Sequence, residues 1–227
     1  MSMGKLQNSR DLAHLHGVKV IGYGDAGAGK TRLCGTAPAP VIFSAESGML
    51  TLRNLDLPVW TVNTLADLQD AFRWVSGSTE ANQFQTVCLD SLSEIAEVVL
   101  AAEKIAKKDA RQAYMELQEQ VLSLVRGFRD LPGKHVYMAA KMSPMKDDES
   151  GLIKYAPAMP GQKLGPALPY LFDEVFHMGV GYTQEGAKFY YLRTQLSNRY
   201  TAKDRSGALD EFEPPDLTHV FNKILGG

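Results

Sequence analysis

The chain has 227 residues, of which 44% are hydrophobic and 22% charged, with a net charge of -2 at pH 7. This length favours one domain with peripheral additions, and the composition is typical of a soluble protein with a hydrophobic core. Because there is no overall basic excess, any nucleic-acid site must be a local patch.

The remaining compositional features predict a cytosolic protein without a membrane partner. No apolar run approaches the roughly 20 residues of a transmembrane helix, and the polar start "MSMGKLQNSR" lacks a signal-peptide core. Cys34 and Cys88 are expected to be small buried core residues in a reducing compartment. The five histidines show no metal-ligand spacing, so we expect no structural zinc.

In chain order, hydrophobic periodicity predicts strands alternating with helices. Strands are expected at 18–23, 41–45, 59–62, 84–90 and 135–140, with an antiparallel pair at 174–182 and 188–194. Helices are expected from about Gly29, from Leu65 with Thr64 as N-cap and Asp67 completing a near capping box, through most of 91–131, and from 216 to the end. The stretch from Ser143 to Pro169 is rich in proline and glycine and is read as an irregular connection.

This order predicts an α/β fold of the doubly wound type, with a mostly parallel sheet and helices on both faces. The late antiparallel hairpin should extend one edge of that sheet, which argues against a small-GTPase layout. We take residues 1–227 as a single domain, in which 1–16 form a short N-terminal segment able to dock on a neighbouring copy as an oligomerisation arm.

The first strand is followed by "GDAGAGKT", which fits the phosphate-binding P-loop G-x-x-x-x-G-K-[ST]. Its glycines let consecutive backbone N–H groups converge on phosphate oxygens, and the next helix directs its positive end at the same anion. Lys30 should reach the β- and γ-phosphates, and the Thr31 hydroxyl should ligate Mg²⁺. The predicted nucleotide-binding residues are Gly24, Asp25, Ala26, Gly27, Ala28, Gly29, Lys30, Thr31, Arg32 and Asp90.

Carboxylates follow two of the predicted strands, at the edge where an open α/β sheet binds its ligand. Asp90 ends the apolar run "TVCLD" and should hold Mg²⁺ together with Thr31, although Asp90 or Ser91 could also cap the next helix. Glu46, after "VIFSA", is the preferred catalytic carboxylate, which would polarise the attacking water, and Glu94 is its rival. The residue after Asp90 is Ser91 rather than a glutamate, which argues against the AAA+ group.

Lys141, at the end of "HVYMAAK", is a candidate sensor of the γ-phosphate. Ser143 and Lys146 could do similar work, and Lys141 could also be an exposed loop lysine.

Together these motifs resemble the RecA-like P-loop ATPases, and among them the short phage AAA-type nucleotide-binding proteins that act as single-strand annealing recombinases. "VIFSAESG" is similar to the RecA strand that ends in its catalytic glutamate, and "VCLDSLSE" to its Mg²⁺-binding strand. "APAMPGQKLGPALPYLFDEVFHM" resembles the loop that precedes an antiparallel strand in the phage group. The resemblance implies that Lys203 and Arg205, in "AKDR", contact the γ-phosphate of a neighbouring subunit as catalytic cations.

The resemblance also implies ATP and Mg²⁺ as cofactors, and single-stranded DNA, single-stranded-DNA-binding protein and further copies of the chain, in a ring or filament, as partners. If the chain is phage-encoded, its place is the host cell cytoplasm. DNA contacts are expected from Lys146, Lys154, Lys163 and Tyr155, with a second basic patch at Lys104, Lys107, Lys108 and Arg111. The alternative is a small P-loop kinase or a nucleotide-gated regulator that binds no DNA. Since no N/T-K-x-D guanine-reading motif is present, ATP is favoured over GTP.

Overall fold

The computed structural model describes residues 16–46, 49–146 and 151–226. All but the last residue of the expected N-terminal arm lies outside this part. The strands are β1 (Lys19–Gly24), β2 (Pro40–Ser44), β3 (Val59–Thr61), β4 (Thr86–Asp90), β5 (His135–Lys146), β6 (Ile153–Ala158), β7 (Glu174–Tyr182), β8 (Lys188–Arg193), β9 (Lys203–Asp204) and β10 (Phe212–Glu213). The helices are α2 (Lys30–Cys34), α3 (Leu65–Gly77), α4 (Leu92–Ala106), α5 (Ala110–Arg129), α6 (Leu164–Ala167) and α7 (Leu217–Leu225), with 3₁₀ turns at Leu50–Leu52, Glu80–Gln83 and Leu168–Tyr170.

The described strands join one sheet, in the order β10-β8-β7-β1-β5-β4-β2-β3. The six strands from β3 to β7 are parallel, and β8 continues the sheet antiparallel to β7. Strands β1, β2 and β4 are buried along their whole length, as expected where helices cover both faces. The predicted α/β architecture, including its antiparallel edge hairpin, is therefore confirmed.

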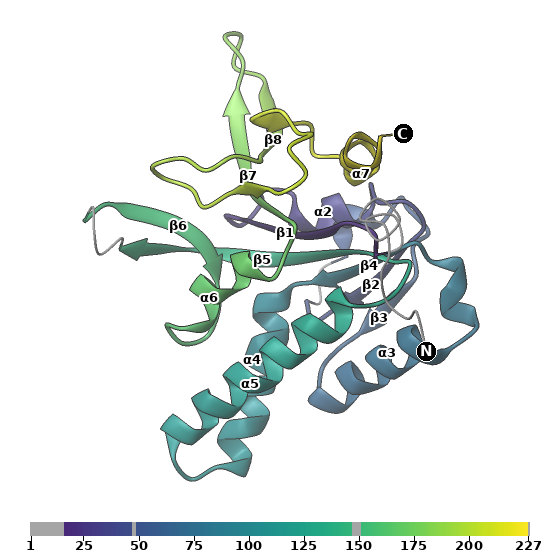
Figure 1. Ribbon diagram of the computed structural model, residues 1–227, viewed down its shortest axis with the longest axis vertical. Helices are drawn as coiled ribbons and strands as arrows, with labels where there is room; N and C mark the ends of the chain where they lie inside the picture. Colours follow the sequence, from purple (N-terminus) through teal and green to yellow (C-terminus); the bar gives the residue numbers. More distant parts are fainter. Residues whose placement is uncertain (1–15, 47–48, 147–150, 227) are drawn as a thin grey trace, which may run out of the picture.

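Helices cover both faces of the sheet (Figure 1). On one face α3, α4 and α5 pack over a cluster that contains Phe43, while on the other α2 and α7 pack over a cluster that contains Ile42. These two neighbours in β2 point to opposite faces because side chains alternate along a strand. Cys34 and Cys88 lie in the second cluster, both buried and free, as predicted.

Side-chain caps fix where the long helices begin. The hydroxyl of Thr64 accepts a hydrogen bond from the backbone N–H of Asp67, whose carboxylate accepts one from the N–H of Thr64, so α3 starts with a complete capping box. Ser91 caps α4 by accepting a hydrogen bond from the N–H of Glu94, and Asp109 caps α5 by accepting one from the N–H of Arg111. The helix predicted through most of 91–131 is divided into α4 and α5 by a short turn between Ala106 and Ala110.

The irregular connection predicted for 143–169 is wrong in its first part. Strand β5 runs on to Lys146 and pairs with β6 as an antiparallel hairpin that includes Pro144 and Pro157. Beyond Lys141 the neighbouring strand β1 has ended, so this part of β5 has β6 as its partner. An edge strand tolerates proline, because the missing N–H can face away from the ladder.

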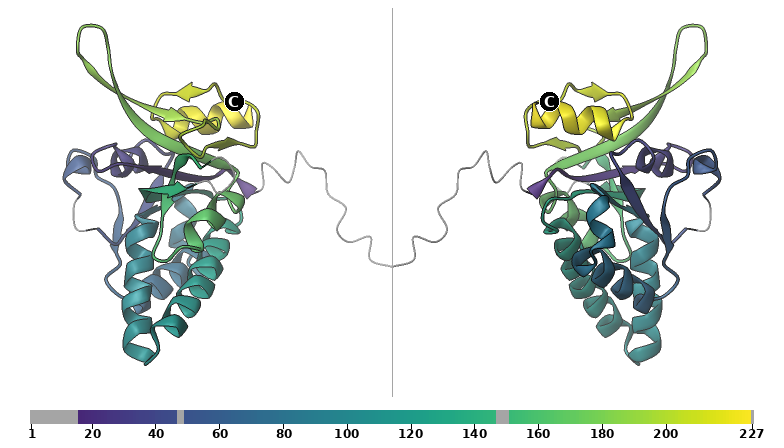
Figure 2. Two further views of the ribbon diagram at one scale, coloured as in Figure 1. Left: turned by 90° about the vertical axis from the view of Figure 1, so that its left-hand side faces the viewer. Right: turned by 90° about the vertical axis from the view of Figure 1, so that its right-hand side faces the viewer.

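A second hairpin, β7–β8, projects from the sheet, with its tip well clear of the helices (Figures 1 and 2). Its turn is closed by a hydrogen bond of 2.8 Å from the N–H of Thr183 to the carbonyl of Ala187, as the sequence predicted. In the described part of the chain, none of the helices is long and apolar enough to cross a membrane.

Candidate functional site

The P-loop joins the end of β1 to the start of α2. Gly27 and Gly29 adopt φ values of 79° and 95°, which L side chains rarely tolerate. The Lys30 ammonium donates hydrogen bonds to the carbonyls of Gly24, at 3.0 Å, and Asp25, at 2.8 Å. It therefore lies inside the curve of the loop, against the backbone that would surround a phosphate.

Gly24 is required for a different reason from the other two glycines. A Cβ at this position would lie 2.6 Å from the carbonyl oxygen of Met178 on β7. The sequence argument assigned all three glycines to phosphate approach, whereas the structure shows that the first lets β1 pack against β7.

Asp90 lies at the end of β4, almost completely buried. Neither of its carboxylate oxygens has a hydrogen-bond partner among the described residues. Burial raises the pKa of Asp90 to about 6, while the nearby Thr31 hydroxyl and Lys30 ammonium act in the opposite direction. Buried carboxylate oxygens without partners are the ligands that a hard cation needs, so Asp90 and Thr31 fit Mg²⁺.

A cavity of about 890 Å³ opens over the P-loop and collects residues from several elements. Glu46 and Lys141 line it together with the whole loop from Gly24 to Thr31. Lys141 pairs in register with Gly24, since β5 lies beside β1. The structure therefore brings the predicted catalytic residues Lys30, Glu46 and Lys141 to one cavity.

The two rival carboxylates lie in different surroundings. Glu46 lines the cavity, and its Oε1 accepts a hydrogen bond of 2.8 Å from the Ser91 hydroxyl. Glu94 instead forms an ion pair with Lys141, which raises the pKa of the lysine. Glu46 therefore faces the cavity, whereas the carboxylate of Glu94 is held by Lys141.

The family of the chain follows from its sequence as well as its site. A profile of the AAA_24 family, described as an AAA domain, matches residues 16–206. The chain belongs to this family. In this AAA domain the glutamate that lines the cavity is Glu46, which lies just after β2, and the position after Asp90 is a serine.

Solved structures resemble the AAA domain in fold. A KaiC-like protein from Pyrococcus horikoshii matches with a TM-score of 0.40 and 13% identity, covering 82% of this chain and 83% of that one. The flagellar accessory protein FlaH from Methanocaldococcus jannaschii matches with a TM-score of 0.46 and 13% identity, covering 93% and 95%. No curated protein matches in sequence. With its family, its strand order and its P-loop, the AAA domain has a RecA-like P-loop ATPase fold.

Several residues that line the cavity were not predicted from the sequence: Leu33, Thr36, Thr51, Met142, Tyr190, Pro215 and Asp216. They come from five separate places in the chain, and no local motif marks them. Two of these segments are joined by a hydrogen bond: the Thr36 hydroxyl, just after α2, accepts from the N–H of Leu217, at the start of α7, at 2.9 Å.

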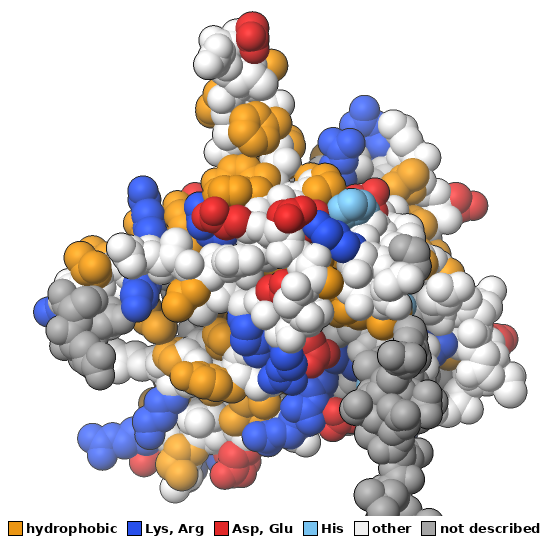
Figure 3. All heavy atoms as spheres, turned by 45° about the horizontal axis from the view of Figure 1, so that its top comes forward, with side chains coloured by type: hydrophobic (Ala, Val, Ile, Leu, Met, Phe, Trp, Pro, Cys, Tyr) orange, Lys and Arg blue, Asp and Glu red, His pale blue; other side chains and the backbone are white. Residues whose placement is uncertain are grey.

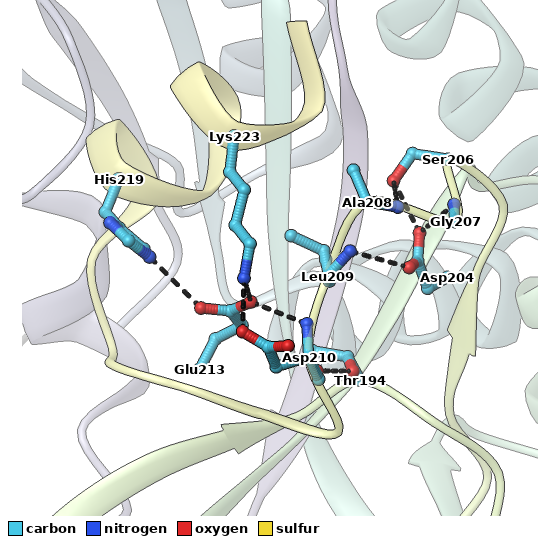
Figure 4. A network of polar contacts seen from close by, with 10 residues as sticks. All are labelled: Thr194, Asp204, Ser206, Gly207, Ala208, Leu209, Asp210, Glu213, His219 and Lys223. Carbon is cyan, nitrogen blue, oxygen red and sulfur yellow. Dashed lines mark hydrogen bonds and ion pairs between the residues drawn. The ribbon is translucent and has the colours of Figure 1, made fainter. Parts of the chain in front are cut away.

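Helix α7 is also held from its other side (Figure 4). Lys223 forms ion pairs with Asp210, at 2.6 Å, and with the buried Glu213, at 2.5 Å. The ring of His219 lies 3.1 Å from the same glutamate. These contacts fix the α7 N-terminus at the rim of the cavity.

Lys203 and Arg205 lie away from the cavity of their own subunit. Lys203 begins β9 and Arg205 follows it directly. Strand β9 pairs with the beginning of β7, whereas the P-loop follows the end of the parallel strand β1. The Lys203 ammonium donates to the carbonyls of Pro169 and Phe172, and Arg205 pairs with Asp173 at 2.9 Å. Action on the nucleotide of a neighbouring subunit remains a prediction for both.

Proposed function

We propose that this AAA domain is a Mg²⁺-dependent ATPase that binds single-stranded DNA and supports phage homologous recombination by single-strand annealing. The observation that carries the ATPase is the gathering of Lys30, Glu46 and Lys141 around one cavity, beside the buried and unpartnered Asp90. Family resemblance adds single-stranded-DNA-binding protein and assembly into a ring or filament to the proposal.

Each residue has a distinct task in hydrolysis. The loop N–H groups and Lys30 bind the phosphates, and Glu46 orients the attacking water and polarises it. Ser91 fixes the direction of Glu46 through their hydrogen bond. Lys141 lies where it can offset charge on the transferred phosphoryl group. Thr31 and Asp90 would hold Mg²⁺, which would supply positive charge to neutralise part of the phosphate charge.

The β5–β6 hairpin supports DNA binding, because it carries basic and aromatic side chains away from the cavity. Lys146 is exposed at its outer end, Tyr155 lies on β6, and Lys163 precedes α6. Such a combination suits backbone phosphates and one stacked base. The other basic patch lies at the tip of the α4–α5 pair, at the opposite end of the molecule from the β7–β8 hairpin (Figure 1).

A hydrogen-bond bridge connects the base of this hairpin to the catalytic side. The buried hydroxyl of Ser93 accepts from the N–H of Lys141, at 2.9 Å, and donates to the carbonyl of Ala158, at 2.7 Å. Lys141 and Ala158 are opposite partners in β5 and β6. A shift of the hairpin on binding DNA would therefore move the residue that lines the cavity, which supports stimulation of hydrolysis by DNA.

The test is the salt dependence of binding to a fluorescent oligo(dT), measured by anisotropy with Mg²⁺ and a non-hydrolysable ATP analogue. Each phosphate contact contributes a slope of about -0.7 to log K against log salt. Lys146→Glu and Lys163→Glu should each lower affinity and reduce the slope by about that amount. Arg126→Glu, at an exposed position on α5 outside both basic patches, is the matched control and should bind as wild type does. If wild-type protein binds no oligo(dT) and phosphorylates a small acceptor, the protein is a kinase and the proposed DNA-binding ATPase is wrong.

A further inference from the structure

The β7–β8 hairpin has two faces with different surroundings. Because side chains alternate along β8, Tyr190 faces the nucleotide cavity while Phe189 and Tyr191 lie on the opposite face. That face continues onto β10, where the Phe212 ring meets the Tyr191 ring with centroids 5.3 Å apart. We call Phe189, Tyr191 and Phe212 the aromatic platform.

Glycines on β7 allow the platform rings to lie over the backbone. A Cβ at Gly181 would be 2.4 Å from Cζ of Phe189, and one at Gly179 would be 2.2 Å from Cζ of Tyr191. One side of each ring is thus turned to a glycine. Phe189 still exposes 45% of its surface. Hydrophobic side chains gather along this projecting hairpin and at its base (Figure 3).

Arginines accompany the aromatic side chains. The Arg193 guanidinium lies 4.4 Å from the centre of the Phe212 ring. The Arg199 guanidinium lies 5.5 Å from the centre of Tyr155 and 5.6 Å from that of Tyr200. Arg193 pairs with Glu211, whereas Arg199 is exposed and forms no ion pair with a carboxylate of the described residues. Arg199 therefore places a positive charge beside the rings of Tyr155 and Tyr200.

The aromatic series runs on from the platform to the β5–β6 hairpin. Tyr191 approaches His177, whose ring stacks on Tyr200 with centroids 3.7 Å apart. Tyr200 lies 5.7 Å from Tyr155 on β6, and the two residues also form a backbone bridge. The two hairpins are thereby joined by one series of rings that has arginines at both ends.

We propose that the aromatic platform and Arg199 form a stacking surface for the bases of single-stranded DNA. This inference rests on the DNA binding proposed above and adds a second contact region to the β5–β6 hairpin. Ring faces suit every base alike, and guanidinium groups add cation–π attraction and reach backbone phosphates. An apolar protein partner would instead favour aliphatic side chains, and the positive charge of Arg199 would not stabilise its binding.

Strand β8 also connects the proposed DNA surface to the nucleotide cavity. Tyr190 lines the cavity and lies between its two platform neighbours in sequence. Its ring is near Gly29 of the P-loop, since a Cβ added to that glycine would be 3.8 Å from Cδ1 of Tyr190. A base stacked on Phe189 would restrain β8 and so restrict the position of Tyr190 beside the loop.

The test separates stacking from simple apolar contact by exchanging Phe189 for leucine or tryptophan. Binding is measured as anisotropy and as the fluorescence of 2-aminopurine within oligo(dT), which reports on stacking. Phe189→Leu should raise Kd by about 5- to 150-fold and remove the 2-aminopurine signal, whereas Phe189→Trp should retain both. Tyr182→Ala is the matched control, because Tyr182 is 68% exposed on the other face of the same hairpin.

The outcomes distinguish the two proposals. If wild-type protein binds oligo(dT) and Phe189→Leu binds it equally well, the platform assignment is wrong and the proposed function stands. If wild-type protein binds no oligo(dT), both fail. A leucine variant that sediments as a smaller species while it keeps its DNA affinity would assign the surface to a second copy of this chain and overturn the inference. Urea unfolding of each variant confirms that it is folded.

Discussion

Glu174 provides the clearest prediction about stability, because its carboxyl group is buried at the start of β7. One oxygen accepts a hydrogen bond of 3.2 Å from the N–H of Ser206, and the other is buried without a partner among the described residues. Asp204 lies directly opposite on β9. Burial, followed by the charge of Asp204, raises the pKa of Glu174 from 4.5 to about 8.

The direction in which stability changes with pH follows from proton linkage. Between pH 4.5 and about 8 the folded protein keeps a proton on Glu174 that the unfolded chain releases. Stability from this group is therefore complete below pH 4.5 and falls as pH rises through that window. One pKa unit corresponds to about 1.4 kcal/mol, so the loss is at most about 5 kcal/mol. Glu174→Gln keeps the acceptor for Ser206 and cannot ionise, and it should abolish this loss.

The assay is urea unfolding of wild type and Glu174→Gln at pH 5 and at pH 8.5. The variant should be close to wild type at pH 5 and more stable by several kcal/mol at pH 8.5. Other titrating groups are common to both proteins and cancel in the difference. Glu119→Gln, at an exposed position on α5, is the matched control and should show the same difference from wild type at both pH values. A Glu174→Gln variant no more stable than wild type at pH 8.5 would refute the reasoning.

Four further substitutions probe the site. Glu46→Gln should lower kcat by about 100-fold or more while the Kd for ATP stays within a few-fold, whereas Glu94→Gln should retain most hydrolysis. Phosphate release measures kcat, and binding of a fluorescent nucleotide measures Kd. Ser91→Ala loses the hydrogen bond to Glu46 and the cap of α4. We therefore expect the free energy of unfolding in urea to fall by about 1 kcal/mol and kcat to fall about ten-fold. An unchanged kcat would show that Ser91 does not position Glu46. Gly24→Ala places a Cβ 2.6 Å from the Met178 carbonyl and should destabilise the fold by about 1–3 kcal/mol, and a wild-type urea midpoint would contradict the packing role.

Local patterns were enough to predict the elements that carry the ATPase motif. The P-loop glycines, the apolar strands and the Thr64 capping box depend on neighbours within a few residues, so the sequence reveals them directly. The position of Asp90 at the end of a buried strand also follows from the apolar run "TVCLD". The β5–β6 hairpin was missed, because Pro144 and Pro157 suggest an irregular segment unless the ending of β1 beside β5 is known.

The remaining lining of the cavity could not be predicted, because it depends on tertiary packing. Tyr190 faces the cavity only because β7 lies next to β1, and Asp216 lines it only because Thr36 holds the start of α7. The aromatic platform likewise needs the register that sets Gly181 opposite Phe189. Such cross-strand partners are fixed by strand pairing rather than by spacing in the sequence.

The measurement that most directly tests the central claim is ATP hydrolysis with Mg²⁺, in the presence and absence of single-stranded DNA, with Lys30→Ala as the blank. Our account predicts a basal rate that single strands increase more than duplex DNA does, and that the variant lacks under every condition. A rate that is indifferent to DNA, or one that persists in Lys30→Ala, would contradict it.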